Sequence, residues 1–224
     1  MLVLFAVPAT ADGPATITVD PNEAGKGSRV TLDVRPPKAN QNPRSLVTRV
    51  VRGVRFDPRA RAKKCSKSQA KEHNCPEKSR IGGGNVDATI RGGPLGGSKA
   101  TTRMDLYLAP PQRDGDRAGI VVNFKVQATG AQGYVIGRVK MLKSGPFGLA
   151  AIFNGLDTAV PTGGFNVHVD RVRLSFGAKR TVDGKTHHLV KNPKSCDGSW
   201  EYEIRIGYPD GSKVPADGSI ACTG

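Results

Sequence analysis

The chain has 224 residues, of which 37% are hydrophobic and 28 are glycine, a balance that suits one large globular β domain. Only 5% of the residues are aromatic, which argues against an extended stacking platform for nucleic-acid bases. The formal net charge is +15, so anionic partners are favoured, and no apolar run reaches the roughly 18 residues of a membrane helix.

The first residues have the features of a shortened signal peptide. An apolar run from Leu2 to Val7 leads into Ala-Thr-Ala, a small-x-small pattern that signal peptidase accepts. We therefore expect residues 1–11 to be removed on export, residues 12–224 to form a single domain, and the protein to be secreted or held at the cell surface. The alternative is a buried strand, since the run is short and has no basic start.

Short runs that alternate apolar and polar residues follow one another along the chain, which is the pattern of half-buried strands. They are residues 15–20, 29–34, 45–56, 82–100, 103–109, 119–128, 133–142, 166–176, 199–208 and 218–222. The run 45–56 also fits a helical stripe, but its valines and Gly53 favour a strand. The run 82–100 combines a glycine-rich strand with a mobile loop, and the apolar residues of 166–176 change face at Asp170-Arg171, which predicts a bulge.

Turn signals separate many of these runs. Asp-Gly occurs six times, and such dipeptides favour the positive φ of tight hairpin turns. No helix of ten or more residues is indicated, although Ser66 to His73 can form a short helical turn that Pro76 ends. The sequence therefore predicts an all-β fold, an antiparallel β-sandwich of about ten strands.

Four cysteines, Cys65, Cys75, Cys196 and Cys222, form two well-separated pairs. Three disulfide pairings are possible and the sequence alone does not choose among them, but local pairing within each pair is the simplest. The alternative is a zinc site with nearby histidines, which the spacings C-x9-C and C-x25-C do not fit. We expect two disulfides, no metal and no cofactor, with Trp200 in the core beside the second bridge.

Positive charge is concentrated between Arg44 and Arg80, where twelve Lys or Arg residues stand against three acidic ones. Such a stretch attracts polyanions, including the acidic polymers of a cell envelope. The candidate contact residues are Arg52, Arg55, Arg59, Arg61, Lys63, Lys64, Lys67 and Lys71. The alternative is that these side chains only form a solvated, solubilising face.

Other functional classes have little support in the residues. The chain shows no helix-turn-helix, finger or RNA-binding motif, so specific nucleic-acid recognition is not expected. It also has no G-x-S-x-G elbow, H-E-x-x-H or Walker loop, and His168 is expected at the surface of its strand. We therefore predict a protein without enzymatic activity and without catalytic residues.

Three stretches carry a family resemblance: VRGVRFDPRARAKKCSKSQ, CPEKSRIGGGNVDATI and KNPKSCDGSWEYEIRIGYPDGSKVPADGSIAC. They resemble an uncharacterised group of exported proteins from high-GC Gram-positive bacteria. The resemblance implies a β domain with two local disulfides, and it brings no catalytic or ligand residues. The basic loop around Cys65 departs from the pattern of that group.

These observations together predict an exported, non-enzymatic binding or structural protein of the envelope, whose basic stretch 44–80 contacts anionic polymers. A secreted hydrolase with an unrecognised site and a non-specific nucleic-acid binder are the alternatives. The oligomeric state is not indicated.

Overall fold

The computed structural model describes residues 13–91, 96–126, 130, 132–159 and 166–224. The expected signal peptide, residues 1–11, and residues 92–95 of the predicted loop after the glycine-rich strand lie outside the described residues. The strands are β1 (Ala15–Asp20), β2 (Arg29–Val34), β3 (Ser45–Val51), β4 (Arg55–Phe56), β5 (Arg80–Arg91), β6 (Lys99–Ala109), β7 (Asp116–Lys125), β8 (Gln132–Met141), β9 (Phe147–Asn154), β10 (Asn166–Phe176), β11 (Lys179–Val182), β12 (Lys185–His188), β13 (Val190–Lys191), β14 (Ser199–Gly207) and β15 (Lys213–Ala221). The helical elements are α1 (Lys67–Lys71) and the 3-10 turns η1 (Pro58–Ala60), η2 (Glu77–Ser79) and η3 (Leu156–Thr158).

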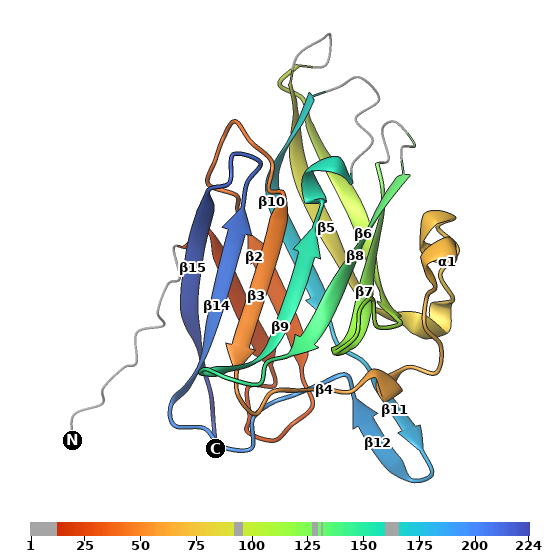
Figure 1. Ribbon diagram of the computed structural model, residues 1–224, viewed down its shortest axis with the longest axis vertical. Helices are drawn as coiled ribbons and strands as arrows, with labels where there is room; N and C mark the ends of the chain where they lie inside the picture. Colours follow the sequence, from red (N-terminus) through yellow and green to blue (C-terminus); the bar gives the residue numbers. More distant parts are fainter. Residues whose placement is uncertain (1–12, 92–95, 127–129, 131, 160–165) are drawn as a thin grey trace, which may run out of the picture.

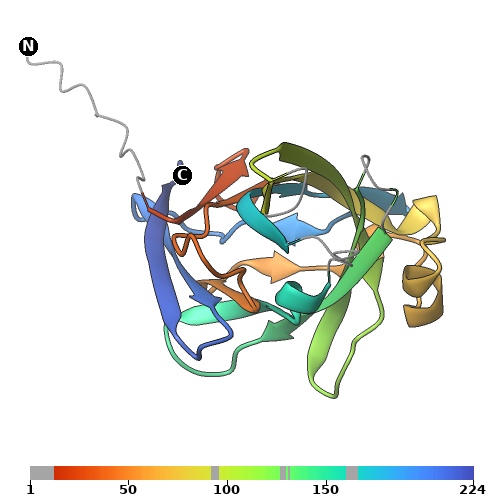
Figure 2. The ribbon, with the colours of Figure 1, turned by 90° about the horizontal axis from the view of Figure 1, so that it is seen from above.

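Eleven strands form one antiparallel sheet in the order β1-β2-β10-β5-β6-β7-β8-β9-β3-β14-β15. The sheet folds over on itself, so that its strands surround a flattened interior when the molecule is viewed from above (Figure 1, Figure 2). Two further pairs, β11-β12 and β13-β4, lie at the lower end. The all-β, antiparallel sandwich expected from the sequence is confirmed.

Alternation along the strands fills this interior. On β14 the side chains of Tyr202, Ile204 and Ile206 are all buried, while Glu203 and Arg205 between them are only half-buried. The buried residues form two large hydrophobic clusters, one centred on β6 and β7 and the other on β1, β2 and β14. Because each strand turns its apolar face inward, burial of these faces is the main force that holds the folded sheet together.

The glycine-rich start of β5 lets the neighbouring strand β10 approach closely. A Cβ atom at Gly82 or Gly84 would overlap the backbone carbonyl oxygens of Ser175 and Arg173 on the neighbouring strand β10. Any other residue at these two positions would push β5 away from β10. The predicted glycine-rich strand is thus confirmed, and its glycines serve close packing.

The first and last strands of the sheet meet at the lower end. Ala24 N donates a hydrogen bond to Thr223 O over 2.8 Å, and Thr223 N donates one to Asn22 O over 3.1 Å. β1 and β15 themselves are not paired in the sheet, so the sheet is nearly closed rather than continuous. The segments that follow β1 and β15 therefore join the two edges of the sheet without a full ladder.

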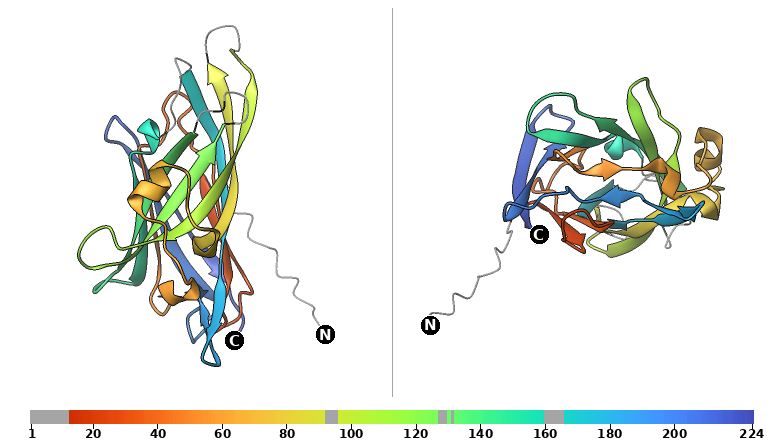
Figure 3. Two further views of the ribbon diagram at one scale, coloured as in Figure 1. Left: turned by 90° about the vertical axis from the view of Figure 1, so that its right-hand side faces the viewer. Right: turned by 90° about the horizontal axis from the view of Figure 1, so that it is seen from below.

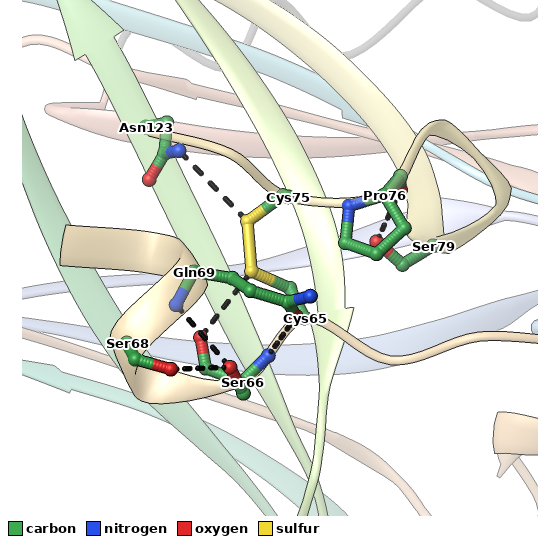
Figure 4. The surroundings of a disulfide bond; sticks show 8 residues. All are labelled: Cys65, Ser66, Ser68, Gln69, Cys75, Pro76, Ser79 and Asn123. Atoms are coloured by element: carbon green, nitrogen blue, oxygen red, sulfur yellow. Dashed lines mark hydrogen bonds between the residues drawn. A yellow bond between two sulfur atoms is a disulfide. The ribbon is translucent and has the colours of Figure 1, made fainter. Parts of the chain in front are cut away.

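The loop from Cys65 to Cys75 packs on the outer face of the sheet, over β6, β7 and β8 (Figure 3). Within it, Ser66 and Gln69 form a reciprocal capping box that starts α1, with Gln69 N donating to Ser66 Oγ and Ser66 N to Gln69 Oε1. Cys65 is fully buried, and Cys65 N donates to Leu108 O at the end of β6. Figure 4 shows the disulfide and the capping box beside it.

The bulge predicted in the run 166–176 is confirmed, since the register of β10 against β5 shifts between Val169 and Arg171. The single run predicted over 45–56 is interrupted, because Gly53 adopts a φ of 97° and separates β3 from β4. β9 and the β11-β12 pair were not among the predicted runs. β9 is rich in small residues and β11-β12 is mainly polar, so neither shows an apolar alternation.

Candidate functional site

Both expected disulfides are present, Cys65–Cys75 and Cys196–Cys222, and the described chain has no free cysteine. Trp200 is buried as predicted, and its indole donates a hydrogen bond to Ser195 O, next to the second bridge. Two disulfides indicate an oxidising compartment, since cytosolic thiols are kept reduced. All four cysteines are therefore paired in bridges, which stabilise the fold.

The eight candidate polyanion contacts do not share one compact face. Arg52, Arg55 and Arg59 lie at the lower end beside β4 and η1, whereas the chain then runs up the outer side of the sheet to α1 with Lys67 and Lys71 (Figure 1). Seven of the eight side chains belong to exposed residues. Arg61 is the exception: it is half-buried, and its Nε atom is buried without a hydrogen-bond partner among the described atoms.

Basic residues from distant parts of the sequence join the lower group. Arg55 on β4 lies directly opposite Lys191 on β13, and the β11-β12 hairpin beside η1 adds Lys179, Arg180 and Lys185. We call the following exposed residues the basic end: Arg52, Arg55, Arg59, Lys143, Lys179, Arg180, Lys185 and Lys191. In the part of the chain that the structure describes, Arg59 alone among them takes part in an ion pair.

A like-charge pair such as Arg55 and Lys191 opposes folding, because directly opposite cations repel each other across two strands. Their joint exposure on a short two-stranded element favours contact with an anion, which would remove the repulsion. Sequence reasoning did not find Lys191 or the hairpin cations because they are more than 120 residues away from Arg55 along the chain.

Asp57 connects two parts of the basic end, the η1 turn and the β11-β12 hairpin. Its carboxylate accepts hydrogen bonds from Arg59 and lies 2.9 Å from His187 Nδ1 on β12. The Arg59 guanidinium, and after it the His187 ring and the Arg59 backbone N–H, hold the pKa of Asp57 well below its usual range. The carboxylate is therefore charged at all ordinary pH values and holds η1 against the hairpin.

A second contact orients Arg52. Its Nε donates to Gly145 O over 2.6 Å and its Nη2 to Lys143 O over 3.1 Å, in the turn between β8 and β9. These acceptors are neutral carbonyls, so the positive charge of Arg52 remains available. The contact brings the turn and Lys143 into the basic end.

The prediction of an exposed His168 is wrong. Only 8% of this residue is exposed, because it lies near the loop before β3, where Asn42 bonds to the backbone of the adjacent Val167 and Val169. Burial, and after it the Arg91 charge, lower the pKa of His168. A polar residue on the outer side of a strand is thus not always exposed, because a neighbouring loop can cover it.

Among the described residues no group of three or more His, Cys, Asp or Glu side chains is placed to hold a metal ion, and no described helix is long and apolar enough to cross a membrane. No protein-family model matches the chain, and no curated protein matches it at a significant level.

Proposed function

We propose that the protein is an exported, non-enzymatic binding protein of the cell envelope that attaches to anionic polymers through its basic end. The observation that carries this proposal is the convergence of eight exposed cationic side chains from β3-β4, η1, the β8-β9 turn and the β11-β13 region on one end of the molecule. The two disulfides support a place outside the cytoplasm, either secreted or at the cell surface.

A polymer with repeated negative charges suits this surface better than a small anion does. The cations lie on separate elements, and contact with several of them at once requires charges spread along a chain. Such binding depends on the release of counterions and is therefore weakened by salt.

The test is co-sedimentation of the oxidised chain with isolated envelopes across a salt series, with duplex DNA as competitor. We expect retention that decreases with salt and resists DNA. Retention that DNA removes completely would favour the non-specific nucleic-acid binder, and no retention at any salt would contradict the proposal.

Matched charge variants locate the contact. Three quadruple alanine variants remove the same charge from different places: Arg55, Arg180, Lys185 and Lys191 at the basic end; Lys63, Lys64, Lys67 and Lys71 at the disulfide loop; and Arg35, Arg44, Lys99 and Lys213 elsewhere on the surface. The slope of log K against log salt should fall by up to about 3 for the first set only, at roughly 0.7 to 0.9 per lost contact. Equal effects of the three sets would mean that net charge alone acts.

A further inference from the structure

An apolar cavity of about 240 Å³ is lined by residues of β5, β6, β10 and η3. Figure 1 shows η3 and the far end of β5 at the upper end of the sheet, away from β4, β11 and β12. Val34 and Ile206 of one hydrophobic cluster and Met104 and Phe124 of the other belong to its wall. The cavity therefore separates the two clusters where the interior would otherwise be filled. Protein interiors seldom leave such space, so a cavity of this size requires a reason.

Two small side chains on adjacent strands leave space in the interior. Ala88 on β5 and Ala100 on β6 are directly opposite each other in the strand register, and both line the cavity. The other inward positions of β5 at this end are larger, namely Val86 and Ile90. The paired alanines thus contribute to the open space beside two adjacent strands.

The wall offers water few partners. It is apolar apart from Asn42, Thr102 and Asp157, and the Asn42 amide is occupied, since its Nδ2 donates to Val167 O over 2.6 Å and its Oδ1 accepts from Val169 N over 2.9 Å. A buried water requires two to four polar partners, and dry apolar cavities of about 150 Å³ bind benzene. An apolar ligand is therefore the favoured occupant.

The shape fits one chain. The lining residues of β5 run from Val86 to Ile90, a length of roughly 13 Å along the strand. By comparison with cavities of about 150 Å³ that bind benzene, which has six carbons, the 240 Å³ of this cavity accept roughly eight to ten carbons. One chain of that size takes up the whole volume, so a second chain is not accommodated.

We propose that this cavity binds a single unbranched alkyl chain of about eight carbons, carried by an amphiphile whose polar head remains at the upper end beside Asp157. The cavity and the basic end share no residue. Failure of this proposal therefore leaves envelope binding unaffected, and the converse also holds.

The first experiment titrates the oxidised chain with 1-alkanols from hexanol to dodecanol, read as displacement of the fluorescent probe N-phenyl-1-naphthylamine. Affinity should rise about fourfold per methylene up to about eight carbons and then level off. Absence of binding, or affinity that does not depend on chain length, would overturn the proposal.

Cavity-filling variants test the position. Ala88→Leu and Ala100→Leu place a larger side chain in the cavity, and each should weaken binding of 1-decanol at least tenfold, whereas Ala62→Leu on an exposed loop should leave it unchanged. Thermal unfolding shows whether each variant is folded. Unchanged binding in folded Ala88→Leu or folded Ala100→Leu would place the ligand elsewhere and refute the proposal.

The polar head is tested with two ligands of equal chain length. Asp157 is the charged residue of the described wall, and its carboxylate repels the carboxylate of decanoate. At pH 7.5, 1-decanol should therefore bind more tightly than decanoate, and Asp157→Asn should reduce this difference in affinity. Tighter binding of decanoate, or a difference that Asp157→Asn leaves intact, would contradict a head beside Asp157.

Discussion

At the scale of single residues, the contacts of Asp57 have the clearest consequence. One carboxylate, only 19% exposed, joins Arg59 on η1 to His187 on β12 and so fixes the position of the hairpin. The charged form is favoured in the folded state, because its partners donate hydrogen bonds to it. An asparagine here would keep one acceptor oxygen but would lose the second oxygen and the negative charge that faces Arg59.

This contact predicts a dependence of stability on pH. The folded-state pKa of Asp57 is lowered, so its contribution is present above the unfolded value near 3.8 and is lost as the pH falls toward the folded value. We expect Asp57→Asn to lower the free energy of unfolding by about 1 to 2 kcal/mol at pH 6, and the gap to close progressively below pH 4. Urea unfolding at several pH values measures this. Asp114→Asn, at an exposed turn residue, is the control, and a gap that stays constant down to pH 2 would contradict the prediction.

At the scale of elements, the disulfide loop is an addition to the outer face of the sheet. Its buried part is small, and it consists of Cys65 and Ala70 from the loop with Ala109 and Val121 from the strands beneath. So few apolar contacts do not hold an eleven-residue loop in place, and the Cys65–Cys75 bridge supplies much of the remaining stabilisation, about 3 kcal/mol in the chain-entropy model.

We therefore expect the double variant Cys65→Ser/Cys75→Ser to open this loop while the sheet persists. Trypsin should cleave after Lys67 and Lys71, which are exposed, much faster than in the wild type, and the far-UV circular dichroism should change little. Removing Cys196–Cys222 in the same way is the matched control. Equal cleavage of the loop in both variants would show that the local bridge does not hold it.

At the scale of the whole molecule, β2, β10 and β14 contribute to a common interior, so we expect the sheet and its two clusters to unfold as one unit. The fluorescence of Trp200 reports on the lower end of β14, whereas far-UV circular dichroism reports on all the strands. The two signals should give coincident denaturant transitions, as expected for a single domain. Two separate transitions would divide the chain into two folding units.

The cavity also has an effect at this scale. At about 24 cal/mol per Å³, an empty space of 240 Å³ costs about 6 kcal/mol, a large share of the 5 to 15 kcal/mol that a domain has in total. A ligand that fills it would recover part of this cost, and so a bound alkyl chain should raise the unfolding temperature.

Local patterns were sufficient for much of the fold. The bounds of β1, β2 and β10 follow directly from their alternation, and the bulge in β10 from the change of face at Asp170-Arg171. The cysteine spacing left three pairings open, and the simplest of them, local pairing, is the one observed. Such features depend on residues a few positions apart, which the sequence displays side by side.

Only the tertiary structure decided the rest. β9 has no alternation and becomes a strand because β8 and β3 pair with it on both sides. Lys191 faces Arg55, and Ala88 faces Ala100, through strand pairing that the sequence does not display. Both candidate sites arise in this way: register and sheet curvature are set by contacts between distant residues, and these contacts determine which charges gather and where the interior stays open.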